Sequence, residues 1–494
     1  MSPQFIGGEM TAWSDLDGTH GAGPVRGAVL APLLAAMSGR TLIAGPHDPT
    51  LIDAAPAGDL TLLVRGIADA QALAARYADR ADITVYCGGL DKLGAAPAYD
   101  TIIALDGLGR LSSVEAAQPT WAEALQLLIA ALQPGGRLLV SVENFFGIHR
   151  LVALPAETTD ADWVVDSEYD PARPAGLARV QAHLTGAGLE LSTTYAAYPQ
   201  ACAPAALLRE DVLADGELTG FLQATLARAA AGTPNVLTDP SRLAAGAVRH
   251  GLAAHLAPAW ILLASLSPST AGPALPEALI RTESGRITGI EGAPRGRTLE
   301  EMLIAAALRR DLPSVRDLLA AWQADHAAAG VPADQVIVTT NDSLIPLTAG
   351  GRPVEALRHF ATTMVRSGLP HPWPAPAGPD DLTLALAAMA GLDLDATDLP
   401  ADELGTFDAA SVRELVVERD RLAAQLAAAV EKTAWYERML ANRDEKLQHA
   451  IGIIDLLSAS GPARAGKALI GGVRAARRTA RSTLRGLLTP RDPG

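Results

Sequence analysis

Apolar runs and amphipathic stretches alternate along the first half of the chain. Leu60–Gly66 and Ile83–Gly88 are almost continuous apolar runs, whereas Ile67–Arg80 and Thr120–Leu132 repeat apolar residues at helical spacing. Runs of the first kind predict strands that are buried on both faces, and stretches of the second kind predict helices that cover them. The alternation therefore predicts an α/β fold with a parallel sheet over residues 27–266.

The same pattern continues toward the middle of the chain. Further strands are expected at Tyr99–Asp106, Gly136–Asn144, Leu189–Pro199 and Ala259–Leu266. The stretch between the last two strands, about 60 residues long, is mostly helical in pattern and is a long insertion for a compact domain. We expect this helical insertion to cover a substrate.

The segments on either side of this domain differ from it in composition. Residues 1–26 are polar and rich in glycine, which predicts a flexible lead, and the proline-rich run Ser267–Ala278 predicts a linker. Residues 279–403 begin with the hairpin pattern LIRTESGRITGIEG and continue with two helical stretches and a second hairpin pattern around Asn341. They are expected to form a separate, small α+β domain.

Residues 409–458 have the pattern of one long helix. Apolar residues recur at two positions of a seven-residue repeat, which predicts a coiled coil, with a solvated single helix as the alternative. The first seam position holds Val412, Arg419, Leu426, Thr433, Leu440, Leu447 and Ile454, and the second holds Leu415, Leu422, Ala429, Tyr436, Arg443, Ala450 and Leu457. Because such a seam needs a partner, we expect self-association through this helix.

Charge is distributed unevenly along the chain. The net charge of −15 at pH 7 argues against a general attraction to nucleic acid. Residues 464–491, by contrast, carry seven arginines and one lysine but no acid, and apolar residues recur among them at helical spacing. Basic amphipathic helices bind anionic membrane surfaces, so this tail is expected to contact such a surface.

Cysteine usage and the first residues bear on the cellular compartment. Cys87 and Cys202 are the only cysteines, and neither has the spacing of a disulfide framework or a zinc site. The chain shows neither the pattern of a signal peptide nor an apolar run long enough to span a membrane. We expect a cytoplasmic protein without a bound metal, which its tail can place at the inner face of the membrane.

Three runs of sequence occur in a characteristic order: TLIAG (residues 41–45), YDTIIALDGLGRL (99–111) and LQPGGRLLVSVEN (132–144). In this order they resemble class I S-adenosylmethionine-dependent methyltransferases, whose fold is Rossmann-like. The run VENFFGIHRL (142–151) resembles methyltransferase-like proteins encoded with bacterial cell-surface polysaccharide enzymes. The resemblance covers less than half of the chain. It implies S-adenosylmethionine as cofactor and a hydroxyl of a glycan or glycolipid precursor as methyl acceptor.

The resemblance also assigns residues to a cofactor site. Gly45 would stand in the turn where backbone N–H groups approach the cofactor. Asp106 would lie near the methyl donor, although an aspartate there also suits the capping of a turn. The second strand ends in Arg65 where an acid should bind ribose, which leaves Asp69 as the nearest acid. Since Pro46 also follows Gly45, either the pocket is atypical or the scaffold has lost its cofactor.

The end of the strand Gly136–Asn144 supplies candidate catalytic groups. Glu143 or His149 could remove the proton from an acceptor hydroxyl, and Asn144 could orient that hydroxyl. The alternative for Glu143 and Asn144 is to satisfy backbone groups of the loop, and the alternative for His149 is simple exposure to solvent.

The run VPADQVIVTTNDSLIPL (residues 331–347) resembles the catalytic hairpin of aminoglycoside-phosphotransferase-like kinases. Leu347 and Thr348 stand where that hairpin has a metal-binding acid, so kinase activity is not expected.

Two functions of different classes follow from these patterns. The first is a methyltransferase with an accessory domain and a coiled-coil tail. The second is a non-catalytic scaffold, in which a degenerate Rossmann-like domain recruits glycan-assembly enzymes through the coiled coil and the basic tail.

Overall fold

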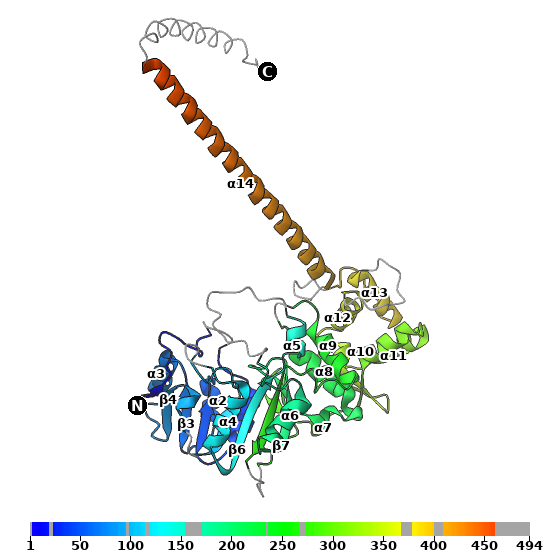
Figure 1. The fold of residues 1–494 in the computed structure, drawn as a ribbon. Coiled ribbons are helices and arrows are strands. Elements are labelled where there is room, and N and C mark those ends of the chain that lie inside the picture. The colour runs from blue at the N-terminus through cyan, green and yellow to red at the C-terminus, as the bar shows by residue number, and fades with distance from the viewer. Residues whose placement is uncertain are drawn as a thin grey trace, which may run out of the picture. The chain divides into compact units, whose positions relative to one another are not determined.

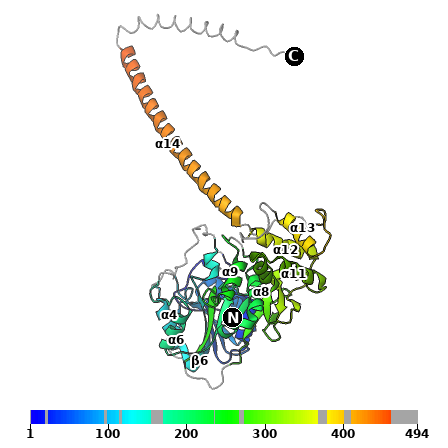
Figure 2. The same cartoon turned by 90° about the vertical axis from the view of Figure 1, so that its right-hand side faces the viewer.

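The structure is a computed structural model, shown in two views in Figure 1 and Figure 2. It describes residues 2–18, 23–94, 98–113, 118–153, 170–233, 236–266, 273–366, 378–399 and 409–459. The chain divides into two compact units, the first ending at Ala410 and the second beginning at Ser411.

The first unit is built on a large twisted sheet (Figure 1), which has eleven strands among the described residues. In order across the sheet the strands are β1 (Gln4–Gly7), β4 (Ile83–Gly88), β3 (Leu60–Val64), β2 (Thr41–Ala44), β5 (Tyr99–Ala104), β6 (Leu132–Glu143), β9 (Ala259–Ser265), β7 (Glu190–Tyr198), β8 (Ala206–Arg209), β10 (Ala278–Arg281) and β11 (Ile287–Thr288). Neighbours from β1 to β6 are parallel, and β9 runs antiparallel between β6 and β7. The sheet confirms the predicted α/β, Rossmann-like fold.

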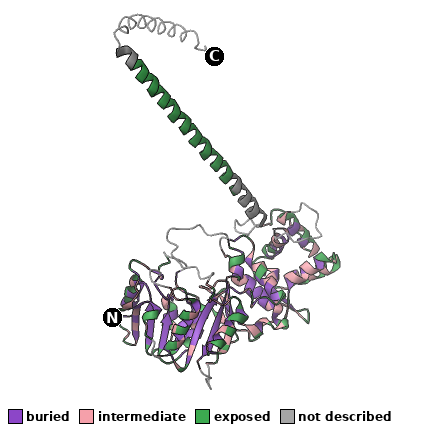
Figure 3. Cartoon of the chain, viewed as in Figure 1, coloured by how far each residue is buried: buried purple, intermediate pink, exposed green. Residues whose placement is uncertain are grey.

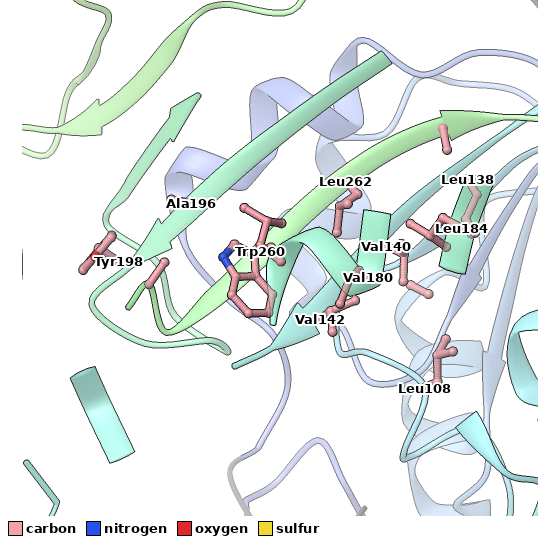
Figure 4. Close-up of a cluster of buried hydrophobic side chains, with 14 of the residues drawn as sticks. Leu108, Leu138, Val140, Val142, Val180, Leu184, Ala196, Tyr198, Trp260 and Leu262 are labelled. Atoms are coloured by element: carbon pink, nitrogen blue, oxygen red, sulfur yellow. The ribbon is translucent and has the colours of Figure 1, made fainter. Parts of the chain in front are cut away.

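Alternate residues of the strands face two hydrophobic cores, one on each side of the sheet. Leu42 of β2 belongs to one core and its neighbour Ile43 to the other. In Figure 4, Val180 and Leu184 of α6 (Leu177–Gly186) lie beside apolar side chains of β6 and β9. Each fully buried aliphatic side chain contributes about 1.5–3 kcal/mol, so these two layers are the main stabilising term of the domain.

Helices cover both faces of the sheet. The face of Ile43 carries η1 (Ala28–Leu30), α1 (Ala31–Ala35), α2 (Pro49–Ala54) and α3 (Ile67–Arg76). The face of Leu42 carries η2 (Leu90–Lys92), α4 (Trp121–Ala131), α5 (Ile148–Leu151), α6, α7 (Glu210–Leu213), η4 (Gly216–Leu218), α8 (Thr219–Ala230) and α9 (Pro240–Arg249). Helices α7 to α9 form the predicted helical insertion between β7 and β9.

The described part of the first 26 residues is not the flexible lead that its composition predicts. Strand β1 pairs in parallel with β4. Further along, Met10 forms a bridge with Gly66 after β3, and Val25 forms one with His47 after β2. Composition missed this arrangement because backbone hydrogen bonds, which need no apolar side chains, attach the segment to the sheet.

The hairpin that was predicted to open the second domain belongs to the large sheet instead. β10 pairs with β8 on one side and with β11 on the other. A hairpin pattern does not specify which sheet it joins, and here β8 offers an edge whose backbone groups need partners. The expected linker, Ser267–Ala278, falls partly outside the described residues, and its last residue begins β10.

A smaller α+β part completes the first unit. Its elements are β12 (Gly296–Thr298), α10 (Leu299–Leu308), α11 (Leu312–Ala324), η5 (Ala333–Gln335), β13 (Val336–Thr339), β14 (Leu344–Pro346), α12 (Pro353–Arg366) and α13 (Pro379–Met389). It has its own core around Trp322 and Phe360. It also contacts the insertion, because Gln335 donates a hydrogen bond of 3.1 Å to the carbonyl of Ala224 in α8.

The second unit contains all but the first two residues of the predicted long helix, α14 (Ala409–Ala459). Its described side chains are exposed (Figure 3), including Leu426, Leu440 and Ile454 of the expected seam. No helix within the described residues is long and apolar enough to cross a membrane. The basic tail, residues 464–491, lies outside the described residues.

Candidate functional site

The candidate site lies at the carboxyl ends of β2, β3 and β5, here called the rim. These strands are parallel, with β2 between β3 and β5, so their carboxyl ends lie on the same side of the sheet. Open α/β sheets bind ligands at such an edge. The structure brings Gly45 and Asp106 together there, because a Cβ placed on Gly45 would lie 3.5 Å from the Cβ of Asp106.

Arg65, just after β3, is held by residues 10–18 and 23–26, here called the N-terminal segment. Its Nε and Nη2 each donate a hydrogen bond of 2.8 Å to the carboxylate of Asp15, and both side chains are only 2% exposed. The ring of Trp13 lies 5.4 Å from the same guanidinium. Burial opposes ionisation of Asp15, but the contacts with Arg65 lower its pKa. The pair is therefore a buried ion pair.

Asp69, in the first turn of α3, anchors the same segment. Its carboxylate accepts hydrogen bonds from the hydroxyl of Ser14 and, at 2.7 Å, from the backbone N–H of Asp15. The side chain is buried, and burial raises its pKa while these hydrogen bonds oppose the rise. The acid expected to bind a cofactor ribose is therefore engaged by the protein's own chain.

Asp106 forms a second buried ion pair at the rim. Nε of Arg110 donates to its Oδ2 at 2.7 Å, Nη2 of Arg110 bonds its Oδ1, and the same Nη2 donates to the carbonyl of Gly23 at 2.7 Å. Burial raises the pKa of Asp106 to about 6, against the effect of Arg110. Arg110 also lies 3.7 Å from Asp15. The two ion pairs thus form one network that connects the sheet to the N-terminal segment.

His47 fills the turn after β2. Gly45 has φ of 90°, a conformation that favours glycine, and its carbonyl lies 3.0 Å from Nδ1 of His47. The N–H of Leu105 donates to Nε2 of the same ring at 3.4 Å. Burial lowers the pKa of His47 to about 4, so the ring is neutral near pH 7 and can donate from Nδ1 while it accepts at Nε2. The imidazole therefore joins the turn after β2 to the residue that follows β5.

As arranged, these residues do not fit S-adenosylmethionine, the cofactor implied by the sequence resemblance. A ribose would need a free acid at the end of β3, where Arg65 is instead paired with Asp15. The donor end would need the backbone around Gly45 and the carboxylate of Asp106, which His47 and Arg110 already contact. These groups are thus already engaged, Arg65 and Asp69 by the N-terminal segment, and Gly45 and Asp106 by His47 and Arg110.

Two residues of this network, Asp15 and Arg110, were not expected from the sequence to have a role at the rim, whereas the bulk of His47 in the turn after β2 was expected. One signal could have found the first of them. Arg65 ends an otherwise apolar run, and a buried charge needs a partner of opposite sign. The N-terminal region, with Asp15 and Asp17, is rich in such partners.

Glu143 and His149, the candidate catalytic pair, do lie together. His149 Nε2 is 3.0 Å from Glu143 Oε1, and Arg150 Nε donates to the same oxygen at 3.0 Å. Burial favours a higher pKa of Glu143, but these contacts lower it to about 2. The carboxylate is therefore a weak base. His149 Nδ1 is buried without a hydrogen-bond partner among the described residues, and it faces the backbone at Gly147. Glu143 ends β6, which runs parallel to β5, so the pair lies at the same edge of the sheet as the rim.

Asn144, the candidate substrate ligand, joins two loops. Its Nδ2 donates to the carbonyls of His255 at 2.8 Å and Ala257 at 2.9 Å, and its Oδ1 accepts from the N–H of Phe146 at 3.1 Å. These are backbone groups of the loops that end β6 and precede β9. Of the two roles considered for Asn144, the structure supports the satisfaction of loop backbone groups.

Comparisons with known proteins give low similarity. No family model and no curated protein matches the chain. A putative sarcosine dimethylglycine methyltransferase from Galdieria sulphuraria is 14% identical, covers 48% of this chain and 81% of its own, and has a TM-score of 0.25. An S-adenosylmethionine-dependent methyltransferase from Mesorhizobium loti is 14% identical, covers 48% of this chain and 98% of its own, and has a TM-score of 0.26. The N-methyltransferase NodS from Bradyrhizobium japonicum, in complex with S-adenosylhomocysteine, is 15% identical, covers 35% of this chain and 78% of its own, and has a TM-score of 0.25.

Proposed function

We propose that this chain is a non-catalytic scaffold built on a Rossmann-like, methyltransferase-like fold. The observation that supports this most strongly is the buried pair of Arg65 and Asp15, through which the N-terminal segment covers the rim. A cofactor could enter only after this pair is separated, and leaving one buried charge unpaired costs about 3–5 kcal/mol. The apparent affinity for a cofactor would fall by roughly 10²- to 10⁴-fold.

In this proposal the remaining parts of the chain make the contacts. Helix α14 would join copies of the chain through its apolar seam, and the basic tail, residues 464–491, would bind an anionic surface at the cytoplasmic face of the membrane. The partners would be glycan-assembly enzymes, a class that is taken from the sequence resemblance of residues 142–151.

The second candidate is S-adenosylmethionine-dependent O-methylation of a glycan or glycolipid precursor. The adjacency of Gly45 and Asp106 at the rim favours it. It requires the N-terminal segment to leave the rim before S-adenosylmethionine binds.

Isothermal titration calorimetry of the full chain with S-adenosylmethionine and S-adenosylhomocysteine separates the two candidates. A scaffold should show no binding at about 1 mM ligand, either as the natural chain or as Ser14→Ala, which removes a hydrogen bond between the N-terminal segment and Asp69. An enzyme should bind, bind more tightly in Ser14→Ala because the segment is loosened, and lose binding in Asp106→Asn. Thermal melting of each variant verifies that it is folded.

A further inference from the structure

Helix α14 carries exposed apolar residues that a single helix does not use. The seam residues Leu422, Leu426, Leu440 and Leu447 are between 54% and 67% exposed, and every described side chain of the helix is exposed (Figure 3). In proteins, most of the stability of a helix comes from packing of its apolar face against another element. As a single helix, α14 therefore leaves its main source of stability unused.

The charges of α14 do not stabilise it as a solvated single helix. Such a helix gains from acid–base pairs three or four positions apart, because those residues are neighbours on its surface. Between residues 422 and 455, no acid lies three or four positions from a lysine or an arginine. The acids there are Glu431, Glu437, Asp444, Glu445 and Asp455, and the bases are Lys432, Arg438, Arg443 and Lys446. The spacing of these charges argues against the solvated single helix.

The positions beside the seam separate charges by sign. The position before the first seam position, here called the leading flank, holds Lys432 and Lys446 and no acid between residues 422 and 455. The position after the second seam position, here called the trailing flank, holds Glu437 and Asp444 and no base over the same residues. In coiled coils these two flanks form the ion pairs between helices that set partner choice and orientation.

A parallel pair of α14 helices suits these flanks, and an antiparallel pair does not. In a parallel, in-register pair, each leading flank faces the trailing flank of the other helix in the next repeat. Lys432 then faces Glu437 of the second copy, because the two residues are five positions apart, as this geometry requires. In an antiparallel pair each flank faces its own kind, which sets lysine against lysine and acid against acid.

Arg443, a cation on the seam itself, fits the same arrangement. In a parallel pair, a residue at the second seam position packs into a hole formed by four residues of the other helix, one of which belongs to the trailing flank. For Arg443 that residue is Asp444 of the second copy. The parallel arrangement thus supplies a counter-charge to a residue that weakens the apolar seam.

We infer that α14 pairs with α14 of a second copy of the chain in a parallel, in-register coiled coil, in which Lys432 of each helix bonds Glu437 of the other. This inference rests on the proposed function, in which α14 joins copies of the chain, and it adds the orientation and the register of that contact. Both copies of the basic tail, residues 464–491, then follow the same end of the coil, where one anionic surface can bind both.

Disulfide cross-linking of the full chain tests the register. Leu426→Cys and Leu440→Cys, each made alone, should give a linked dimer after mild oxidation, because each residue faces its own copy across the seam. An antiparallel pair brings at most one position opposite itself. Ala441→Cys, next to Leu440 but off the seam, is the matched control. This variant and the natural chain, which contains Cys87 and Cys202, should remain largely unlinked on a non-reducing gel.

Exchange of charges tests the orientation, with sedimentation equilibrium of the full chain as the measurement. Lys432→Glu places like charges opposite each other on both sides of the dimer and should raise the dissociation constant about tenfold at low salt. Glu437→Lys should have the same effect. The double variant restores the attraction and should return the dissociation constant to within about threefold of the natural value. Arg438→Glu makes the same change of charge on the side away from the seam and should leave the dissociation constant unchanged.

The outcomes separate this inference from the proposed function. A chain that self-associates, but is cross-linked by only one or neither of the seam cysteines, would overturn the parallel register and leave the contact through α14 in place. A double charge variant that dimerises as weakly as Lys432→Glu would also overturn the inference. A monomeric natural chain would overturn both the inference and the role of α14 in the proposed function.

Discussion

Arg65 and Asp15 lie 50 positions apart in the sequence, yet they form a two-pronged ion pair in which each side chain is 2% exposed. The pair joins the end of β3 to the segment between β1 and β2. Because neither charge can be left alone in the interior, the segment and the sheet are expected to fold and unfold together.

Removal of one member of the Arg65–Asp15 pair should destabilise the folded protein. Asp15→Ala should lower the free energy of unfolding by about 3–5 kcal/mol, because Arg65 remains buried without a counter-charge. Urea denaturation measures this change. Asp53→Ala removes the exposed partner of Arg76 and should lower it by less than about 1 kcal/mol. A similar decrease in the free energy of unfolding of the two variants would show that the buried pair of Arg65 and Asp15 stabilises the fold no more than an exposed ion pair does.

His47 should make stability depend on pH. Its pKa falls from 6.5 to about 4 on folding, so the unfolded chain takes up the proton first as the solution is acidified. The contribution of neutral His47 is complete above about pH 6.5 and is lost as the pH falls toward about 4, an effect of up to about 3 kcal/mol. His47→Gln should remove this part of the pH dependence.

The free energy of unfolding is measured for the natural chain and for His47→Gln at pH 7 and at pH 4.5. The difference between the two proteins should change between these pH values. Asp106, whose pKa burial raises to about 6, gains stability on acidification and acts in the opposite direction. It is present in both proteins and largely cancels in the difference. A difference that stays constant with pH would contradict the assignment to His47.

The contact between α8 and β12 should tolerate no side chain at Gly220. A Cβ there would lie 2.6 Å from the carbonyl oxygen of Gly296. Gly220→Ala should therefore reduce the free energy of unfolding by about 1–3 kcal/mol. Gly186→Ala, in α6 with open space around the position, should instead raise it by roughly 0.5–1 kcal/mol. A stabilised Gly220→Ala variant would mean that the two elements do not touch in solution.

Helix α14 should mediate self-association. Leu440 lies on the predicted seam and is 56% exposed, so it is available to a partner helix. The full chain should sediment as a larger species than a chain that ends at Glu403, and Leu440→Lys should shift it toward the smaller species. Trp435→Lys is the control, because Trp435 is similarly exposed but lies off the seam. A monomeric full chain would refute the prediction.

The fold of the first domain was largely predictable because its signals are local. Strands such as β3 and β5 are apolar over nearly their whole length, and α4 begins at Thr120 with a capping box that includes Glu123. The errors concern β1, β10 and β11, short strands whose position depends on backbone pairing with a distant partner rather than on their own side chains.

The candidate site was predictable in its position but not in its contacts. Gly45 and Asp106 stand at the rim because the ends of parallel strands must meet there. Whether a carboxylate at that rim is free or paired depends on residues far away in the sequence, such as Asp15 for Arg65 and Gly23 for Arg110. No spacing rule connects these residues.

Strands β1 and β11 have a further effect, on the solubility of the fold. The outermost strands of a sheet expose unpaired backbone groups that can template pairing with another chain. Here those positions are taken by strands of only four and two residues, while the longer apolar strand β4 is shielded by β1. β1 pairs with the second half of β4, at Tyr86, Cys87 and Gly88. A chain that lost residues 1–8 would expose this part of the β4 edge, and the first consequence would be association between sheets of different molecules.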